Sequence, residues 1–208
     1  MKKTLLGLLT LVASFNTFAQ TAEEFFSVNC VACHGEKGKG QSDLLTVPKL
    51  AGQNEKYLIK QINDFKSGDR VNALMAAPIT ALPDNMVEEV AKYLSMQTKT
   101  IGNADPALVE LGQSLYRAGN SETGVPACTA CHSPTGSGNA PGGIPSLSGQ
   151  HADYIESQLK AYRLGYRDEI PSDSVRVNDG ETKIMRTIAF KLKDFEIEAL
   201  SSYINGLH

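Results

Sequence analysis

The sequence predicts an all-α fold built from two tandem copies of one domain. Three observations support this prediction: a pentapeptide that occurs twice, a series of matching residues at a nearly constant separation, and apolar residues at helical spacing. Strand-like alternation of apolar and polar residues is not sustained anywhere in the 208 residues. The expected units are an export signal over 1–19, a first domain over 20–100 and a second domain over 101–208.

The repeated pentapeptide is Cys-x-x-Cys-His, which is the attachment signature of c-type haem. Two thiols add to the two vinyl groups of one porphyrin, so they must lie one helical turn apart. The histidine that follows, His34 or His132, then becomes the proximal iron ligand. We therefore expect two covalently bound haem c groups. The thiols that hold them are Cys30, Cys33, Cys128 and Cys131.

Other uses of the four cysteines fit the pattern less well. A thioredoxin-like dithiol needs no histidine after its second cysteine. A Cys₄ zinc site pairs two Cys-x-x-Cys knuckles about 15–20 residues apart, whereas Cys33 and Cys128 are separated by almost a hundred residues. Disulfides are compatible with an oxidising compartment but leave the two histidines unexplained.

The N-terminus has the composition of a cleaved secretory signal. Lys2 and Lys3 precede a short apolar run over 5–12, and Thr17-Phe18-Ala19 has small residues where a signal peptidase acts. The run is too short for a membrane span, which needs about 20 residues. Because c-type haem is attached outside the bacterial cytoplasm, we expect a periplasmic protein. Removal of Lys2 and Lys3 leaves 18 of the 20 basic residues, against 23 acidic residues. The sequence contains no cluster of basic residues of the kind that binds nucleic acid.

The repeat extends far beyond the pentapeptides. Its members in the first half recur 97 residues later in the second half: Pro48, Leu50, Gly52, Gln53, Tyr57, Gln61, Gly68 and Arg70 match Pro145, Leu147, Gly149, Gln150, Tyr154, Gln158, Gly165 and Arg167. Further along, Leu82, Asp84 and Tyr93 match Leu192, Asp194 and Tyr203 at a separation of 110. Helices are expected over 21–30, 54–65, from Asp84, from Asp105, over 153–164 and over 194–204, with a linker over 97–104.

The repeat also selects the second axial ligand of each iron. Met75 and Met185 are separated by 110 residues, whereas Met86 and Met96 have no methionine at the equivalent position. We therefore expect the axial pairs His34 with Met75 and His132 with Met185. A carbonyl near Pro48 and one near Pro145 are expected to accept the Nδ1–H of each proximal histidine.

Three features of the second half leave alternatives open. His151 competes with Met185 as a ligand, but it aligns with Asn54 at a helix start, where capping or solvent exposure is expected. Between Arg167 and Met185 the second half carries extra polar residues, either a docking or haem-covering loop or a plain surface insertion. Arg70 and Arg167 are candidates to pair with haem propionates, and the uncertain position of the insertion makes Arg176 a rival to Arg167.

On these motifs the sequence resembles the di-haem cytochrome c4 family. The resemblance implies two cytochrome c-like domains related by a pseudo-twofold axis. It implies a periplasmic electron carrier between a quinol-oxidising complex and a terminal oxidase or reductase, with membrane association only through such partners. Close relatives serve flavoprotein dehydrogenases, so a haem subunit of such an enzyme is the alternative. A di-haem peroxidase is a further alternative, but such an enzyme needs an iron with an open axial position. A methionine at the same repeat position in both halves favours an electron carrier that has no substrate turnover of its own.

Overall fold

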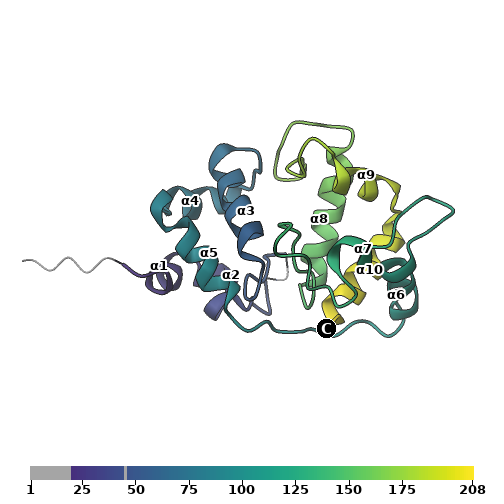
Figure 1. Cartoon of the computed structure of the whole chain (residues 1–208), viewed down its shortest axis with the longest axis horizontal. Helices are drawn as coiled ribbons and strands as arrows, with labels where there is room; N and C mark the ends of the chain where they lie inside the picture. The colour runs from purple at the N-terminus through teal and green to yellow at the C-terminus, as the bar shows by residue number, and fades with distance from the viewer. Residues whose placement is uncertain (1–19, 45) are drawn as a thin grey trace, which may run out of the picture.

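The computed structural model describes residues 20–44 and 46–208, so the expected export signal over 1–19 lies outside it. Two helical bodies lie side by side and are joined by a segment that runs along one edge of both (Figure 1). Within the described ranges there is no strand, only two isolated β-bridges. The prediction of two tandem all-α units is confirmed.

The first body consists of five α-helices and two short 3₁₀ turns. The α-helices are α1 (Ala22–Asn29), α2 (Val31–His34), α3 (Glu55–Ser67), α4 (Ala73–Ala81) and α5 (Val87–Ser95). A capping box begins α1: the Thr21 hydroxyl accepts from the Glu24 N–H, and the Glu24 carboxylate accepts from the Thr21 N–H. The buried residues of α5 recur at helical spacing and pack against α1 and α3 around Phe26.

The second body repeats this order of helices. They are α6 (Val109–Ala118), α7 (Thr129–His132), α8 (Ala152–Gly165), α9 (Ile184–Lys191) and α10 (Asp194–Gly206). The expected helix start at Asp105 is wrong. Asp105 begins a turn, in which its carbonyl accepts from the Leu108 N–H at 3.0 Å, and the helix begins only at Val109.

The change in repeat separation from 97 to 110 has a direct structural counterpart. Lys66 on α3 forms an ion pair with Asp84 at 2.6 Å, and Arg163 on α8 forms one with Asp194 at the same distance. The two basic residues are 97 apart and the two acidic residues 110 apart. Both bodies therefore have the same ion pair between the long helix and the residue that begins the last helical segment. The second body keeps this ion pair although the insertion separates its two residues.

The linker and the insertion both connect the two bodies. In the linker, the Thr100 hydroxyl donates to the Lys39 carbonyl at 3.1 Å, and the Gly102 N–H donates to the Asn205 carbonyl at 3.0 Å. In the insertion, the Asp173 carboxylate accepts from the N–H of Ala73, the first residue of α4, at 2.6 Å. The insertion thus extends from the second body and contacts the first body, and it does not lie only on the surface of the second body.

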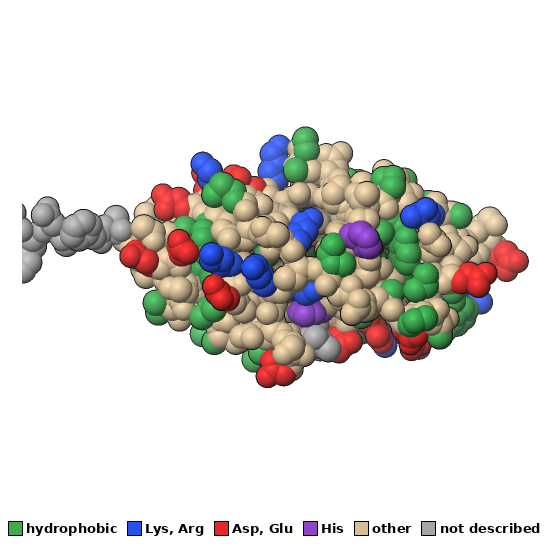
Figure 2. Space-filling model, turned by 90° about the horizontal axis from the view of Figure 1, so that it is seen from below, with side chains coloured by type: hydrophobic (Ala, Val, Ile, Leu, Met, Phe, Trp, Pro, Cys, Tyr) green, Lys and Arg blue, Asp and Glu red, His purple; other side chains and the backbone are tan. Residues whose placement is uncertain are grey.

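Among the described residues, no helix has the length and apolar character that crossing a membrane requires. The surface carries charges of both signs. On the face seen in Figure 2, acidic and basic side chains are interspersed, and no patch of one sign covers it. A broad basic surface of the kind that binds nucleic acid is not seen on this face.

Candidate haem centres and the interface between them

Both Cys-x-x-Cys-His motifs form one short helical turn. In α2 the His34 N–H donates to the Cys30 carbonyl at 3.0 Å, and in α7 the His132 N–H donates to the Cys128 carbonyl at 2.9 Å. In the described residues the four cysteines form no disulfide with one another, and Cys33 and Cys131 are exposed while the other two are partly buried. This is the one-turn spacing that attachment to two vinyl groups needs.

The histidines of both motifs are buried and held by the expected carbonyls. His34 Nδ1 lies 2.9 Å from the Pro48 carbonyl oxygen, and His132 Nδ1 lies 3.1 Å from that of Pro145. Burial lowers the pKa of both imidazoles, against a smaller upward effect of the carbonyls, which favours the neutral form of each ring. With Nδ1 as the donor, Nε2 is the nitrogen left for iron. The two hydrogen bonds that the sequence predicts between these histidines and the proline carbonyls are present.

The alternatives for the cysteines do not match these surroundings. Burial raises the pKa of Cys30 and of Cys128 to about 11, with the second cysteine of each motif adding to it. A redox dithiol needs the opposite, a lowered pKa. Within residues 20–44 and 46–208, no group of three or more His, Cys, Asp or Glu side chains is arranged to hold a metal ion.

The methionines lie where the repeat places them. Met75 is the third residue of α4 and Met185 the second residue of α9, both partly buried. The Met75 N–H donates to the Asn72 side chain at 3.2 Å, which fixes the start of α4. Met86 is a core residue, 7% exposed, and Met96 is 68% exposed, as expected for methionines without a ligand role.

The structure shows which of the two arginines of the second half occupies the position equivalent to Arg70. Arg70 stacks on Phe65 at 4.6 Å, and Arg176 stacks on Tyr162, the repeat partner of Phe65, at 4.5 Å. Arg167 instead lies over Phe190 at 5.1 Å. Arg176 is therefore the counterpart of Arg70.

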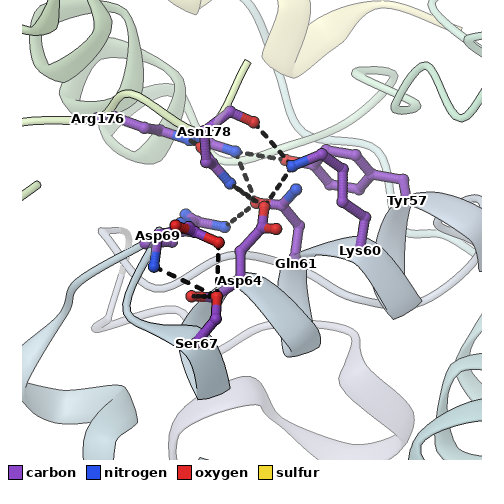
Figure 3. Close-up of polar contacts among 9 residues, drawn as sticks. Tyr57, Lys60, Gln61, Asp64, Ser67, Asp69, Arg176 and Asn178 are labelled. Carbon is purple, nitrogen blue, oxygen red and sulfur yellow. Dashed lines mark hydrogen bonds and ion pairs between the residues drawn. The ribbon is translucent and has the colours of Figure 1, made fainter. Parts of the chain in front are cut away.

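These two arginines form a symmetrical network across the interface. Each guanidinium donates to the glutamine of its own domain and to the tyrosine and glutamine of the other, at 2.8–3.0 Å. The acceptors are Gln61, Tyr154 and Gln158 for Arg70, and Gln158, Tyr57 and Gln61 for Arg176. Figure 3 shows Arg176 and Asn178 reaching Tyr57, Gln61 and Asp64 on α3.

Among the described residues, neither guanidinium of this network has a carboxylate partner. In the described part of the chain, no Asp or Glu oxygen lies within ion-pair distance of Arg70 or Arg176, although Arg176 is only 6% exposed. A buried cation without a counter-charge is costly. Each haem c carries two anionic propionates, so the chemistry of these donors fits the group that the motifs predict.

A second symmetrical contact lies between the segment that precedes α3 and the segment that precedes α8. The Gln53 side chain donates to the Ser146 carbonyl at 2.9 Å and accepts from the Ser146 N–H at 2.7 Å. The Gln150 side chain does the same with Lys49, at 2.9 and 2.8 Å. Gln53 with Gln150 and Lys49 with Ser146 are repeat partners at 97 residues. Sequence reasoning found the matched glutamines but gave them no role, and their constant separation was the available signal.

His151 departs from expectation. It occupies the residue before α8, as aligned, but its side chain neither caps the helix nor lies in solvent. It is 8% exposed, and among the described residues its buried Nε2 has no hydrogen-bond partner. A Cβ added at Gly40 would lie 2.4 Å from that nitrogen, so the ring is packed against the loop after His34. Packing between the two domains, which the repeat alignment does not show, decides its position.

Comparison with known proteins agrees with this arrangement. The cytochrome c family model matches residues 19–98 and 109–208. Cytochrome c4 of Pseudomonas aeruginosa is 47% identical over 179 residues, covering 86% of this chain and 84% of the relative. The thiosulfate dehydrogenase electron acceptor of Thiomonas intermedia is 34% identical over 182 residues, covering 86% and 78%. The crystal structure of reduced recombinant cytochrome c4 from Pseudomonas stutzeri superimposes with a TM-score of 0.81 at 43% identity, over 90% of this chain and 97% of that one.

Fold and site together define a tandem c-type cytochrome with two covalently bound haem c groups. The chain belongs to the cytochrome c4 family of electron carriers.

Proposed function

We propose that the protein carries single electrons through two low-spin haems, each with a histidine and a methionine as axial ligands. The ligand pairs are His34 with Met75 and His132 with Met185. The observation that supports this most directly is that each histidine is buried and held by a proline carbonyl at equivalent positions of both domains. With both axial positions of each iron filled, no substrate needs to bind.

Separate groups of residues would attach the haems and balance their charge. Cys30 and Cys33 would attach one haem, and Cys128 and Cys131 would attach the other. The haem supplies an iron that alternates between the ferrous and ferric states. Arg70 and Arg176 would balance propionate charge at the interface between domains 20–100 and 101–208. Met/His ligation raises the reduction potential relative to two nitrogen ligands.

We infer a periplasmic location, after removal of residues 1–19, and partners that are redox proteins: a quinol-oxidising complex as donor and a terminal oxidase or reductase as acceptor. The alternative is a haem subunit or direct electron acceptor of a dehydrogenase. The relative named thiosulfate dehydrogenase electron acceptor favours this alternative for a more distant branch, at 34% identity. A di-haem peroxidase requires an iron with an open axial position, which the paired methionines disfavour.

The decisive experiment combines intact mass with a spectroscopic redox titration. The exported protein should have the mass of residues 20–208 plus two haems, with no free thiol. Titration should show two one-electron steps, and carbon monoxide should leave the ferrous spectrum unchanged because no axial position is open. A carbon monoxide complex at neutral pH would contradict the carrier function and favour an enzyme.

A further inference from the structure

Each proximal histidine is the first member of a hydrogen-bond chain that ends in the other domain. His34 Nδ1 donates to the Pro48 carbonyl at 2.9 Å. The N–H of the same peptide group belongs to Lys49, and it donates to Oε1 of Gln150 at 2.8 Å. The chain therefore runs from a ligand of the first haem, through one peptide group, to a side chain of the second domain.

The second domain has the mirror arrangement. His132 Nδ1 donates to the Pro145 carbonyl at 3.1 Å, and the N–H of that peptide group, from Ser146, donates to Oε1 of Gln53 at 2.7 Å. Both glutamines are rigidly placed, because each Oε1 also accepts the N–H of the next residue, at 2.8 Å for Gln53 and 3.0 Å for Gln150. They are 8% and 6% exposed, so water does not compete.

A peptide group is a conjugated unit, so a hydrogen bond at one end changes the other. When the N–H is bonded to an acceptor, electron density moves toward the carbonyl oxygen, which becomes a stronger acceptor. A stronger acceptor at Nδ1–H makes the imidazole a more basic ligand. A more basic ligand stabilises ferric over ferrous iron and lowers the reduction potential. Burial strengthens the effect because the local dielectric is low.

We propose that each glutamine tunes the haem of the opposite domain: Gln150 the first haem through His34, and Gln53 the second haem through His132. Both act as positioning residues, since neither touches a haem ligand directly. The potential of each haem then depends on docking of the other domain, and a partner that loosens the interface raises both potentials. The proposal rests on histidine ligation as proposed above.

The test uses the full-length holoprotein with Gln150→Met and Gln53→Met, substitutions that keep side-chain length and remove the acceptor. Two readouts are taken: the ¹⁵N chemical shift of each histidine Nδ1, and the potential of each haem from domain-assigned haem methyl signals during titration. For Gln150→Met we expect His34 to shift and the first haem to rise in potential, with the second haem unchanged. Gln53→Met should give the reverse pattern.

Gln150→Glu provides the opposite sign, because a carboxylate is a stronger acceptor for the Lys49 N–H, while the bond that Gln150 donates to the Lys49 carbonyl is lost as in Gln150→Met. It should lower the potential of the first haem below that of the unmodified protein. If each methionine variant shifts both haems equally, or only the haem of its own domain, the proposal is overturned. Failure of the carrier function itself would be seen separately, as loss of two low-spin, six-coordinate spectra in the unmodified protein.

Discussion

Arg70 and Arg176 occupy equivalent positions on opposite sides of the domain interface, although the sequence repeat pairs Arg70 with Arg167. Each guanidinium donates to both Gln61 and Gln158, one of which belongs to its own domain and the other to the opposite domain. Their separation is 106 residues, against 97 before them and 110 after them, so nine of the extra residues precede Arg176 and four follow it. The insertion is thus divided around an interface residue.

The first prediction concerns the charge of these arginines. Arg176→Gln removes a buried cation that has no carboxylate partner in the described part of the chain. Because a nearby positive charge favours the ferrous state, we expect both reduction potentials to fall, and the interface to weaken. Arg167→Gln is the matched control, since Arg167 is exposed and stacks on Phe190 away from the network. A redox titration of both variants checks this, and equal effects of the two would contradict it.

The second prediction concerns the methionine ligands. Met75→Ala and Met185→Ala should each remove about half of the weak far-red band of ferric Met-ligated haem, because each affects one of two irons. Met86→Ala is the control: it creates a cavity in the first core and should lower stability by about 2–5 kcal/mol while leaving the band intact. Loss of the band in Met86→Ala, with none in Met75→Ala, would refute the ligand assignment.

The third prediction concerns the order of the two potentials. The second domain, with nine basic and thirteen acidic residues, is more acidic than the first, with nine and ten. Negative charge stabilises ferric iron, so the second haem should have the lower potential, by on the order of tens of millivolts. The structure reduces the insertion's share, because Glu169 pairs with Lys183 and Asp179 with Arg186. Its remaining acidic residues are Asp168, Asp173 and Glu181.

Neutralising those three residues together, as Asn, Asn and Gln, should bring the two potentials closer. Haem methyl signals assigned by domain measure this in the intact protein. A second haem with the higher potential, insensitive to salt, would show that net charge does not set the difference.

The fourth prediction concerns pH. Burial lowers the pKa of His151, and Lys49 adds to this, whereas Asp153 acts in the opposite direction. The folded protein therefore binds a proton at His151 less readily than the unfolded chain, in which the histidine has its ordinary pKa of 6.5. The stability that depends on neutral His151 is present above pH 6.5 and is lost as pH falls toward the lowered pKa. His151→Asn, which copies Asn54 of the first domain, should flatten this part of the curve in denaturant unfolding. An unchanged pH dependence would exclude His151 as its source.

The sequence by itself determined the haem attachment residues, the duplication and the helical class. These depend on local chemistry: the Cys-x-x-Cys-His spacing is set by one helical turn, and the helices α3, α5, α8 and α10 follow from apolar residues at helical spacing. Even the proline carbonyls were predictable, because each lies only 13 or 14 residues from its histidine in a short loop.

Only the tertiary structure decided what happens between the two domains. Gln53 and Ser146, or Arg176 and Tyr57, are about a hundred residues apart in the chain, and no local pattern relates a side chain to a distant peptide group. The repeat alignment also could not place a gap within the insertion, so it favoured Arg167, and it treated His151 as a copy of Asn54. Docking of the two domains buries His151 against Gly40. It also selects Arg176, because this buried guanidinium finds acceptors in Tyr57 and Gln61 of the neighbouring domain.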